Sequence, residues 1–265
     1  MIKLIKNEKA FFKRERLDKI LALLNEKKFV SIEELQSLLN VSTITIRRDI
    51  KELENRMLVQ KVYGGVKKID SNILESRFTE RRMIHSRQKI SIAKTALQFV
   101  NNGDTIFIDS SSTAFELVRL CKEKRNDIHM VTNSLMSALE LLENPTCTIT
   151  LIGGTVRIDN ISSIGMDAEE MVKHLNAEKA FISCRAFMPS KGTFEISPSI
   201  GIIKRTMAKN SNKVYLLVDD SKFFKRSAFM AVSTDDIDVV ITNNSVHEKI
   251  TKELPKHIQL FKSSE

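Results

Sequence analysis

Long apolar runs are missing from this chain of 265 residues. No stretch approaches the ~18 consecutive apolar residues that a membrane-spanning helix needs, and this lack excludes a transmembrane protein. The opening segment, MIKLIKNEKAFFKR, has no apolar run of useful length, so we expect no signal peptide. The chain also shows no short-period repeat and no low-complexity tract.

Cysteine is scarce, since the chain holds only Cys121, Cys147 and Cys184. Their odd number and wide spacing provide neither a disulfide framework nor the ligand pattern of a zinc site. A chain of this kind suits a reducing compartment, and we expect it in the cytoplasm.

Catalytic and metal-binding patterns are also missing. The histidines have neither metal spacing nor a nucleophile as partner: His85, His129, His174, His247 and His257. Such residues are more often ordinary surface or hydrogen-bonded side chains than ligands. Ser110, Ser111 and Ser112 lack the GxSxG context of a hydrolase. We therefore expect no metal, no cofactor and no catalytic residue.

Positive charge is concentrated at one end of the sequence. The chain has 42 lysines and arginines against 33 aspartates and glutamates, a net charge of +9. Residues 1–70 hold 16 basic and 10 acidic residues, so they carry +6 of this charge and the longer remainder carries +3. A basic head on a more neutral body is typical of a nucleic-acid-binding protein.

The segment Ser31–Lys61 predicts two short helices joined by a tight turn. Ser31 and Glu34 have the spacing of a capping box. Asn40 interrupts the helical pattern, and Ser42 is placed to cap the next helix. The apolar residues of the first helix recur at helical spacing: Leu35, Leu38 and Leu39.

The second helix has two unlike faces. One is apolar and must face a core: Ile46, Ile50, Leu53 and Met57. At roughly 100° per residue, the opposite face carries Ile44, Arg47, Arg48 and Lys51. A solvated amphipathic helix shows the same periodicity, but the capped first helix, the short turn and the adjacent arginines favour a helix that lies in a DNA major groove. The residues expected at the DNA are Ser42, Thr43, Ile44, Thr45, Arg47, Arg48 and Lys51.

The segment Leu58–Ile69 predicts a β-hairpin after these helices. Strand-forming residues flank Gly64 and Gly65, which supply the turn. A further helix from Phe11 to about Glu26 precedes the pair, and together these elements predict a winged helix-turn-helix. The hairpin residues expected to contact DNA phosphates beside the groove are Lys61, Tyr63, Lys67 and Lys68.

Three parts are expected along the chain. Residues 1–70 form the winged helix-turn-helix DNA-binding domain. Residues 71–86 are polar without clear periodicity, and we interpret them as a linker or as an arm packed on the second domain. Residues 87–265 form an α/β domain, in which apolar strands alternate with helices. Such alternation predicts a mostly parallel sheet covered on both faces.

The elements of this second domain are read from its apolar pattern. Helices are expected at Gln88–Val100, Thr113–Lys122, Leu135–Leu142, Asp167–His174 and Ile200–Lys209. Strands are expected at Thr105–Asp109, Ile128–Thr132, Thr148–Ile152, Lys179–Ser183, Lys213–Val218 and Val239–Thr242.

Polar residues follow several of these strands, at the sheet edge where α/β folds bind ligands. Small and hydroxyl residues let backbone N–H groups approach a ligand, and a helix N-terminus favours an anion. One such turn usually only caps a helix, but four at one edge predict a phosphate-sized pocket. Its expected residues are Asp109, Ser110, Ser111, Ser112, Thr113, Thr132, Asn133, Ser134, Gly153, Gly154 and Lys222.

Both halves resemble the DeoR-type bacterial repressors. In the head the resemblance lies in ERLDKILALLNEKKFVSIEELQSLLNVSTITIRRDIKELE and KVYGGV, and in the body it lies in IDSSST, VTNS, LIGGTVR, SIGMDAE, Lys204-Arg205 and VDDSKF. The resemblance covers about residues 14–245. It implies a winged helix-turn-helix fused to an α/β sensor domain that is similar to ribose-5-phosphate isomerase, with Lys204 among the residues that bind the effector.

One loop departs from the pattern of that isomerase. The isomerase has an Asp-bearing loop with the catalytic base after the strand that ends here at Ser183, but this chain continues with Cys184, Arg185, Ala186 and Phe187. An arginine does not act as such a base. Two roles remain open for Arg185, namely binding of a second anionic group or simple exposure at the surface.

Together with these observations, the resemblance implies a transcriptional repressor of sugar-utilisation genes that is not an enzyme. Its partners are expected to be double-stranded operator DNA, a phosphorylated sugar that modulates operator binding, and further copies of the chain in a homodimer or homotetramer. The alternatives are a sugar-phosphate isomerase with an appended DNA-binding domain and a non-specific nucleic-acid-binding module.

Overall fold

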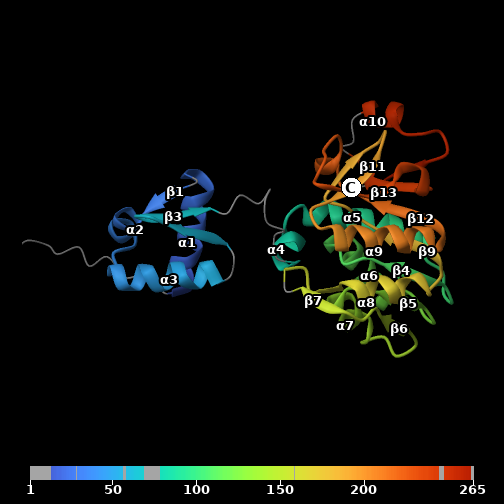
Figure 1. Cartoon of the computed structure of the whole chain (residues 1–265), viewed down its shortest axis with the longest axis horizontal. Helices are drawn as coiled ribbons and strands as arrows, with labels where there is room; N and C mark the ends of the chain where they lie inside the picture. Colours follow the sequence, from blue (N-terminus) through green and yellow to red (C-terminus); the bar gives the residue numbers. More distant parts are fainter. Residues whose placement is uncertain are drawn as a thin grey trace, which may run out of the picture. The chain divides into compact units, whose positions relative to one another are not determined.

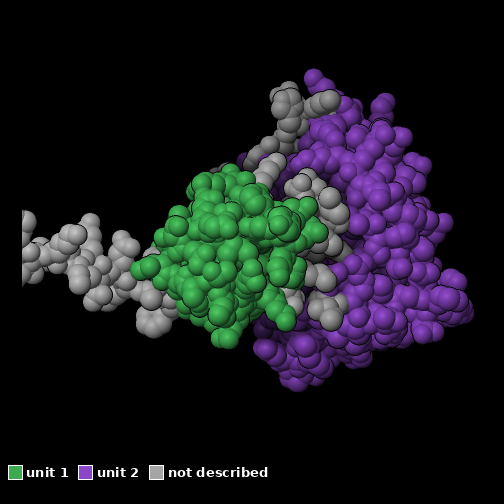
Figure 2. All heavy atoms as spheres, turned by 60° about the vertical axis from the view of Figure 1, so that its left-hand side comes forward, with its two compact units in different colours: residues 1–74 green, residues 75–265 purple. Residues whose placement is uncertain are grey.

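The computed structural model in Figure 1 describes residues 13–27, 29–55, 58–68, 78–157, 159–244 and 248–263. The chain divides into two compact units, Met1–Leu74 and Glu75–Glu265, coloured separately in Figure 2. Each unit is considered by itself below. The expected boundaries at residues 70 and 86 remain predictions.

Unit 1 is a three-helix domain with a small antiparallel sheet. Its described elements are α1 (Lys13–Lys27), β1 (Phe29–Ser31), α2 (Ile32–Leu39), α3 (Thr43–Asn55), β2 (Val59–Val62) and β3 (Gly65–Lys68). The strand order is β1-β3-β2, so β3 lies between the two others. The helix expected from Phe11 to Glu26 is observed as α1, whose described part begins two residues later and ends one residue later.

Local signals fix the ends of α2. The Ser31 side chain accepts a hydrogen bond from the Glu34 amide at 3.1 Å, as the capping-box spacing predicts. Asn40 ends the helix in the left-handed conformation, with φ of 50°, which asparagine tolerates better than most residues. The turn between α2 and α3 therefore follows from Asn40 and from the cap of α3 at Ser42.

The core of unit 1 joins all three helices to the sheet. It contains Leu17, Ile20, Leu24, Val30, Leu35, Leu39, Ile46, Ile50, Leu53, Val59 and Val66. Met57, which was expected to extend the apolar face of α3, lies outside the described residues. An ion pair also joins α1 to α3: Arg16 Nε lies 2.7 Å and Nη2 3.2 Å from the buried carboxylate of Asp49. Its two-pronged geometry fixes the angle between these helices.

Unit 2 contains a seven-stranded sheet in which all neighbouring strands are parallel. The order is β15-β14-β12-β9-β4-β5-β6. The strands are β4 (Thr105–Ile108), β5 (His129–Thr132), β6 (Thr148–Leu151), β9 (Ala177–Ile182), β12 (Ser211–Leu217), β14 (Val239–Asn243) and β15 (Gln259–Ser263). The strand order reverses between β4 and β9, and ligands bind at such reversal points in α/β sheets.

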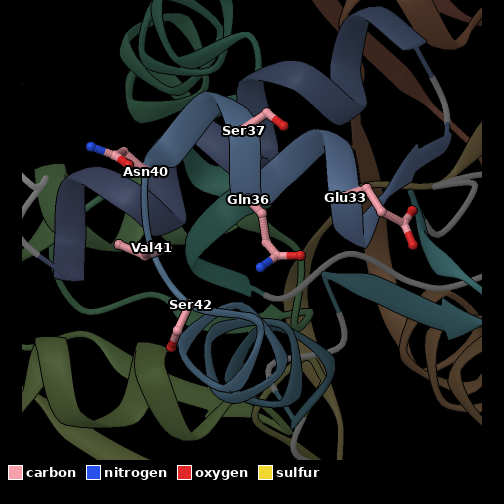
Figure 3. A pocket seen from close by; sticks show the side chains of 6 residues that line it. All are labelled: Glu33, Gln36, Ser37, Asn40, Val41 and Ser42. Atoms are coloured by element: carbon pink, nitrogen blue, oxygen red, sulfur yellow. The ribbon is translucent and has the colours of Figure 1, made fainter.

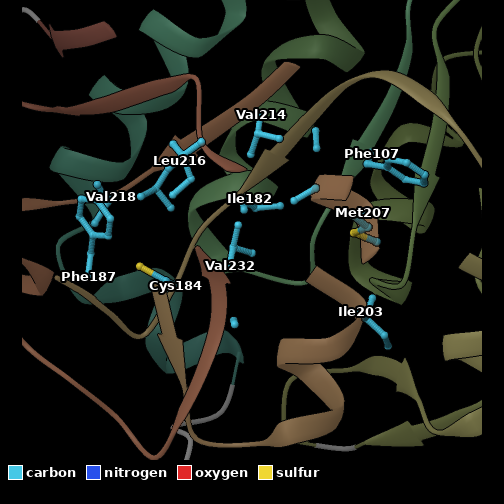
Figure 4. Close-up of a cluster of buried hydrophobic side chains, with 14 of the residues drawn as sticks. Phe107, Ile182, Cys184, Phe187, Ile203, Met207, Val214, Leu216, Val218 and Val232 are labelled. Carbon is cyan, nitrogen blue, oxygen red and sulfur yellow. The ribbon is translucent and has the colours of Figure 1, made fainter. Parts of the chain in front are cut away.

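Helices cover both faces of this sheet. The expected ones are α5 (Ser86–Ala96), which continues as a 3₁₀ turn over Leu97–Phe99, α6 (Ser112–Lys124), α7 (Leu135–Leu141), α8 (Met166–Lys173) and α9 (Pro198–Lys209). One apolar cluster joins α5, α6 and α7 to the sheet. A second joins α8 and α9 to it and includes Phe107, Ile182, Phe187, Met207 and Leu216 (Figure 4).

Several elements were not anticipated from the sequence. They are α4 (Phe78–Met83), the antiparallel pair β7 (Thr155–Arg157) and β8 (Ser162–Ile164), the antiparallel sheet of β10 (Ala186–Met188), β11 (Gly192–Glu195) and β13 (Phe229–Ser233), α10 (Glu248–Glu253) and β15. One further detail also differs from expectation. The hairpin turn falls at Tyr63-Gly64, because Gly65 already pairs in β3.

Candidate functional site

The exposed face of α3 carries the cations expected to contact DNA. Arg47, Arg48 and Lys51 are exposed, while the opposite face of the helix is buried against α1 and α2. Ile44 stands on the same side with 74% of its surface exposed. An apolar side chain beside two arginines can contact thymine methyl groups while the arginines bind guanine edges.

The N-terminal turn of α3 is also open to solvent. The Ser42 hydroxyl accepts a hydrogen bond from the Thr45 amide at 3.3 Å and lies 3.0 Å from the Thr45 hydroxyl. Thr43 and Thr45 are half-buried, so they line the turn without belonging to the core. This turn precedes Arg47 and Arg48, as in helices that read base edges with their first turns.

The hairpin of β2 and β3 presents the remaining expected contacts in unit 1. Lys61, Tyr63 and Lys67 are exposed, and Tyr63 at the turn is fully so. The side chain of Lys68 lies outside the described structure. The Lys61 amide donates a hydrogen bond to Glu54 Oε1 at 3.1 Å, which holds β2 against α3. The hairpin and α3 therefore form one rigid candidate surface for DNA.

A shallow surface recess adjoins this candidate surface. It is lined by α2 and the turn before α3, through Glu33, Gln36, Ser37, Asn40, Val41 and Ser42 (Figure 3). Apart from Glu33 its lining is uncharged, and none of the expected effector residues contributes to it. The recess belongs to the helix-turn-helix, and the effector residues must be sought in unit 2.

In unit 2, Asp109 connects the ends of the two central strands. Its Oδ2 accepts a hydrogen bond from the Ser183 amide after β9 at 2.9 Å, and its Oδ1 accepts one from the Ser111 amide after β4 at 3.0 Å. Asp109 is completely buried. It thus fixes the two backbone segments that leave the sheet at its reversal point.

Lys204 on α9 is bound within this cluster. Its ammonium lies 3.1 Å from Asp109 Oδ2, donates to the Ser183 carbonyl at 2.9 Å and pairs with Glu195. Burial opposes the charge, but Asp109 and then Glu195 raise the pKa of Lys204 above its ordinary value. All three donors of the ammonium are engaged inside the protein. Lys204, expected as an effector ligand, is placed to organise the crevice.

Lys222 is the more open of the two expected lysines, with 20% of its side chain exposed. Its ammonium lies 3.2 Å from the Ser183 hydroxyl and 3.6 Å from Asp219 Oδ2. Burial alone would raise the pKa of Asp219, but Lys222 and a hydrogen bond from Ser221 hold it below its usual value. Arg185 is half-buried at the exit of β9, where its amide donates to Phe194.

The hydroxyl-rich turn after β4 is buried and begins α6. Ser111 caps the helix by accepting a hydrogen bond from the Ala114 amide at 3.1 Å. Ser110 and Ser112 are nearly covered, and the buried Thr113 hydroxyl has no hydrogen-bond partner among the described residues. Ser111 therefore acts as a helix cap, and the adjacent N-terminus of α6 supplies a positive end to the crevice.

The turn after β5 is equally well buried. The Thr132 hydroxyl donates to the Ile108 carbonyl at 2.7 Å, and Ser134 caps α7 through the Ser137 amide at 3.1 Å. Asn133 Nδ2 donates to the Ser163 carbonyl at 3.1 Å. Polar atoms in this region without a hydrogen-bond partner among the described residues are Asn133 Oδ1, Ser137 Oγ, Asn160 Oδ1 and Ser162 Oγ.

The two glycines after β6 differ in their surroundings. A Cβ atom on Gly153 would meet open space, whereas one on Gly154 would lie 2.6 Å from the Ile164 carbonyl. Gly154 also has φ of 125°, a conformation that side-chain-bearing residues rarely adopt. Gly154 is therefore needed for the close approach to β8, and Gly153 remains exposed.

Hydrogen bonds and ion pairs bring four of the expected effector residues together with Ser183 at the reversal point. These four are Asp109, Ser111, Lys204 and Lys222. Gly153 and Gly154 follow the edge strand β6, two strands away from β4. Sequence reasoning did not assign Lys89, Glu195 or Asp219 to the site. Asp219 stands within the VDDSKF motif, but nothing in the periodicity marked Lys89 as buried.

The groups at this edge of the sheet suit an anion. They include the Lys222 ammonium and the positive N-terminal end of α6, and no group of three or more His, Cys, Asp or Glu residues in the described ranges is placed to bind a metal. Burial raises the pKa of the Cys184 thiol to about 12, so this residue is a poor nucleophile. None of the helices in the described ranges is long and apolar enough to cross a membrane.

Comparison with protein families defines the class. Residues 16–72 match the DeoR-like helix-turn-helix domain, and residues 84–244 match the DeoR C terminal sensor domain. The chain therefore belongs to the DeoR family of DNA-binding transcriptional repressors, and the resemblance noted in the sequence is confirmed.

Two relatives illustrate the match. The HTH-type transcriptional regulator GolR of Listeria innocua is 31% identical, over 91% of this chain and 94% of its own length. The Lactose phosphotransferase system repressor of Lactococcus lactis is 30% identical, over 95% of this chain and 99% of its own length. Both relatives are named as regulators and not as enzymes. The expectation of a regulator without enzymatic activity is therefore confirmed.

Among solved structures, ribose 5-phosphate isomerase A from Methanocaldococcus jannaschii is similar over 53% of this chain and 56% of its own. Its sequence identity is 15% and its TM-score 0.40, values too low to carry an argument about function. The enzymatic alternative thus receives no support from the relatives or from the loop after Ser183, where Cys184 and Arg185 stand.

Proposed function

We propose that this protein represses sugar-utilisation genes, and that a phosphorylated sugar bound in unit 2 modulates its affinity for operator DNA. The observation that carries the proposal is the group of polar contacts at the strand reversal. There the partly exposed Lys222 ammonium lies beside Ser183. Helix α6 begins directly after β4, which pairs with β9, the strand that precedes Ser183. A cation and a helix N-terminus are the groups that bind a phosphate.

For the DNA-binding surface we propose α3 and the hairpin. In this arrangement Arg47 and Arg48 contact base edges, while Lys61 and Lys67 contact phosphates. The protein then acts as a homodimer or homotetramer, because a single winged helix contacts few base pairs and paired heads bind more tightly. Light scattering of the full chain with and without DNA tests this assembly, and a monomer that binds the operator tightly would contradict it.

A thermal-shift screen of the full chain tests the effector. The panel contains glucose 6-phosphate, fructose 6-phosphate, fructose 1-phosphate and ribose 5-phosphate, each beside its unphosphorylated sugar. A ligand at a hundred times its dissociation constant adds about 2.7 kcal/mol of stability. We expect stabilisation by at least one phosphorylated sugar and none by its unphosphorylated form. Stabilisation by neither would contradict the proposal.

A matched pair of variants locates the phosphate. Lys222→Gln removes a charge-assisted hydrogen bond, so it should weaken sugar-phosphate binding by about 1.5–3 kcal/mol in calorimetry. Lys225→Gln removes an exposed lysine three residues further along the chain and should leave binding unchanged. By linkage, the effector must change operator affinity by the same factor as the operator changes effector affinity.

A further inference from the structure

Helix α4 is attached to the first turns of α6, the helix that begins at the proposed phosphate loop. The Phe78 and Phe115 rings meet edge to face with centroids 5.2 Å apart. Arg82 Nε lies 3.1 Å from Glu116 Oε1, and its guanidinium lies 4.4 Å from the centre of the Phe115 ring. In chain order, α4 is also the first described element after the DNA-binding unit (Figure 1).

The C-terminal end of α4 is also held by Lys89 on α5. This lysine is only 4% exposed, and its ammonium donates hydrogen bonds to the carbonyls of Arg81 and Ile84, the latter at 2.7 Å. A helix of six residues is not stable on its own, so contacts outside it must keep it folded. A cation at the C-terminal end of a helix is favourable because it compensates the free carbonyl groups there.

Lys89 also lies at the ligand-binding edge of the sheet. The first turns of α5 lie at the edge where the strands end, because the Ser91 hydroxyl donates a hydrogen bond at 2.7 Å to the hydroxyl of Ser263, the last residue of β15. Burial, and next the charge of Lys222, lower the pKa of Lys89 to about 8, whereas Asp219 acts in the opposite direction. The Lys89 ammonium therefore stands between α4 and the residues of the proposed phosphate site.

We propose that Lys89 couples the effector crevice to α4, by releasing the Arg81 and Ile84 carbonyls to bind the phosphate of a sugar held beside Lys222. An ammonium and a phosphate carry opposite full charges, whereas the carbonyls that Lys89 leaves are neutral, and the anion also offsets the repulsion between Lys89 and Lys222. The inference rests on the proposed function, because it requires an anionic effector at Lys222.

This change of hydrogen-bond acceptors at Lys89 affects the segment that leads to the DNA-binding unit. Once Lys89 leaves the two carbonyls, α4 loses two of its attachments and keeps others, among them the contacts of Phe78 and Arg82 with α6 and the hydrogen bond from the Phe78 amide to the Asp159 carbonyl. Residues 69–77 connect α4 to unit 1 along the chain. A loosened α4 therefore changes the anchor of the DNA-binding unit on the sensor unit. The ligand acts on operator affinity through this anchor.

Amide hydrogen exchange of the full chain tests whether Lys89 changes its hydrogen-bond acceptors when the ligand binds. The probes are inorganic phosphate and the sugar phosphates of the panel above, at concentrations that saturate the thermal shift. For the wild-type chain we expect the amides of residues 82–84 to exchange about tenfold faster with a stabilising sugar phosphate, because α4 opens locally more often. In Lys89→Met they should exchange at the faster rate with and without ligand.

Lys94→Met is the matched control, since Lys94 lies on the same helix and is exposed. It should behave as the wild type. If a sugar phosphate stabilises the chain but leaves the exchange at residues 82–84 unchanged or slower, the coupling role of Lys89 is refuted while the proposed function stands. If neither inorganic phosphate nor any sugar phosphate stabilises the chain, both fail.

A second variant keeps the test informative if Lys89→Met folds poorly. Arg82→Gln weakens the attachment of α4 to α6 without touching Lys222, so sugar-phosphate affinity should stay within about threefold of the wild type. The operator duplex for this measurement is selected from a random library by the full chain. The measured quantity is the factor by which the sugar phosphate changes the affinity for this duplex. This factor should fall to within about twofold of unity in Lys89→Met, and it should be reduced in Arg82→Gln. Undiminished coupling in both variants overturns the inference.

Discussion

In the DNA-binding unit, Arg47, Arg48 and Lys51 are exposed on one face of α3, whereas in the sensor unit Asp109, Glu195 and Lys204 are almost fully buried and bound to one another. Under the proposed function, the two units therefore meet their partners in different ways. A large rigid partner such as DNA meets side chains that already point outward. The small anion proposed for the sensor unit must be surrounded, so the groups near it also carry the packing of the domain.

This difference predicts where binding and stability can be separated by substitution. On α3, replacing a cation should change DNA affinity and leave folding intact, because solvent already hydrates the side chain. At the reversal point, replacing one member of the cluster should damage folding first. The predictions below test this contrast, from the largest expected effect to the smallest.

The largest effect is expected for Lys204→Met. Removing the ammonium leaves the buried carboxylates of Asp109 and Glu195 without their cation, which typically costs about 3–5 kcal/mol. Urea unfolding of the sensor unit, followed in the full chain, measures the loss. Lys209→Met on the same helix removes an exposed lysine and should stay within about 0.5 kcal/mol of the wild type. A loss as small as that of the control would show that the cluster is not interdependent.

The second effect concerns pH. The pKa of Lys89 is lowered to about 8 in the folded chain from an ordinary value of 10.5, so the unfolded chain holds this proton more strongly. The charged form therefore reduces stability below pH ~8, and this penalty disappears as the pH rises towards ~10.5. The charged groups that act on Lys89 are Lys222, Asp219, Arg81 and Glu116.

Comparison with Lys89→Met isolates this titration. Between pH ~7.5 and ~10, the free energy of unfolding of the wild type should rise relative to that of the variant by on the order of 2 kcal/mol. Denaturation curves at several pH values measure the difference. A constant or falling difference would show that Lys89 keeps its ordinary pKa.

The contrast between exposed side chains in unit 1 and buried ones in unit 2 also explains which elements and site residues could be predicted from the sequence. Helical periodicity was sufficient for α2 and α3, because one face of each meets the core and the other meets water. The same periodicity assigned Arg47, Arg48 and Lys51 to the exposed face. In unit 2, alternating apolar strands and helices correctly predicted the parallel sheet and the approximate ends of six of its seven strands, all but β15.

What escaped prediction depends on contacts between distant segments. Lys204 meets Glu195 because α9 packs against β11 and β13 of the antiparallel sheet, and strands of three to five residues leave little periodic signal. Lys89 was unremarkable because a lysine on a helix is usually exposed. The hairpin turn shifted because Gly65 must approach Val30, whose carbonyl would lie 2.4 Å from an added Cβ.

A smaller effect, confined to DNA binding, is expected for Arg47→Ala. Loss of a bidentate contact to a base should cost about 1–3 kcal/mol of operator affinity and relax the preference at one base pair. Fluorescence anisotropy at fixed salt measures it, and urea unfolding should be unchanged. Lys27→Ala serves as the control in the same unit, since Lys27 pairs with Glu34 at the end of α1. Equal operator affinity for Arg47→Ala and wild type would remove Arg47 from the site.

The smallest effect is expected for Lys67→Ala, at the exposed hairpin. A lysine that contacts a phosphate contributes to binding of any duplex, so the loss should be the same for the operator and for random DNA. The slope of log affinity against log salt should become less steep by about one unit, because one fewer counterion is released. A loss confined to the operator would instead show that Lys67 contacts a base. The hairpin and α3 would then share sequence recognition, and the separation between phosphate contacts and base contacts within unit 1 would fail.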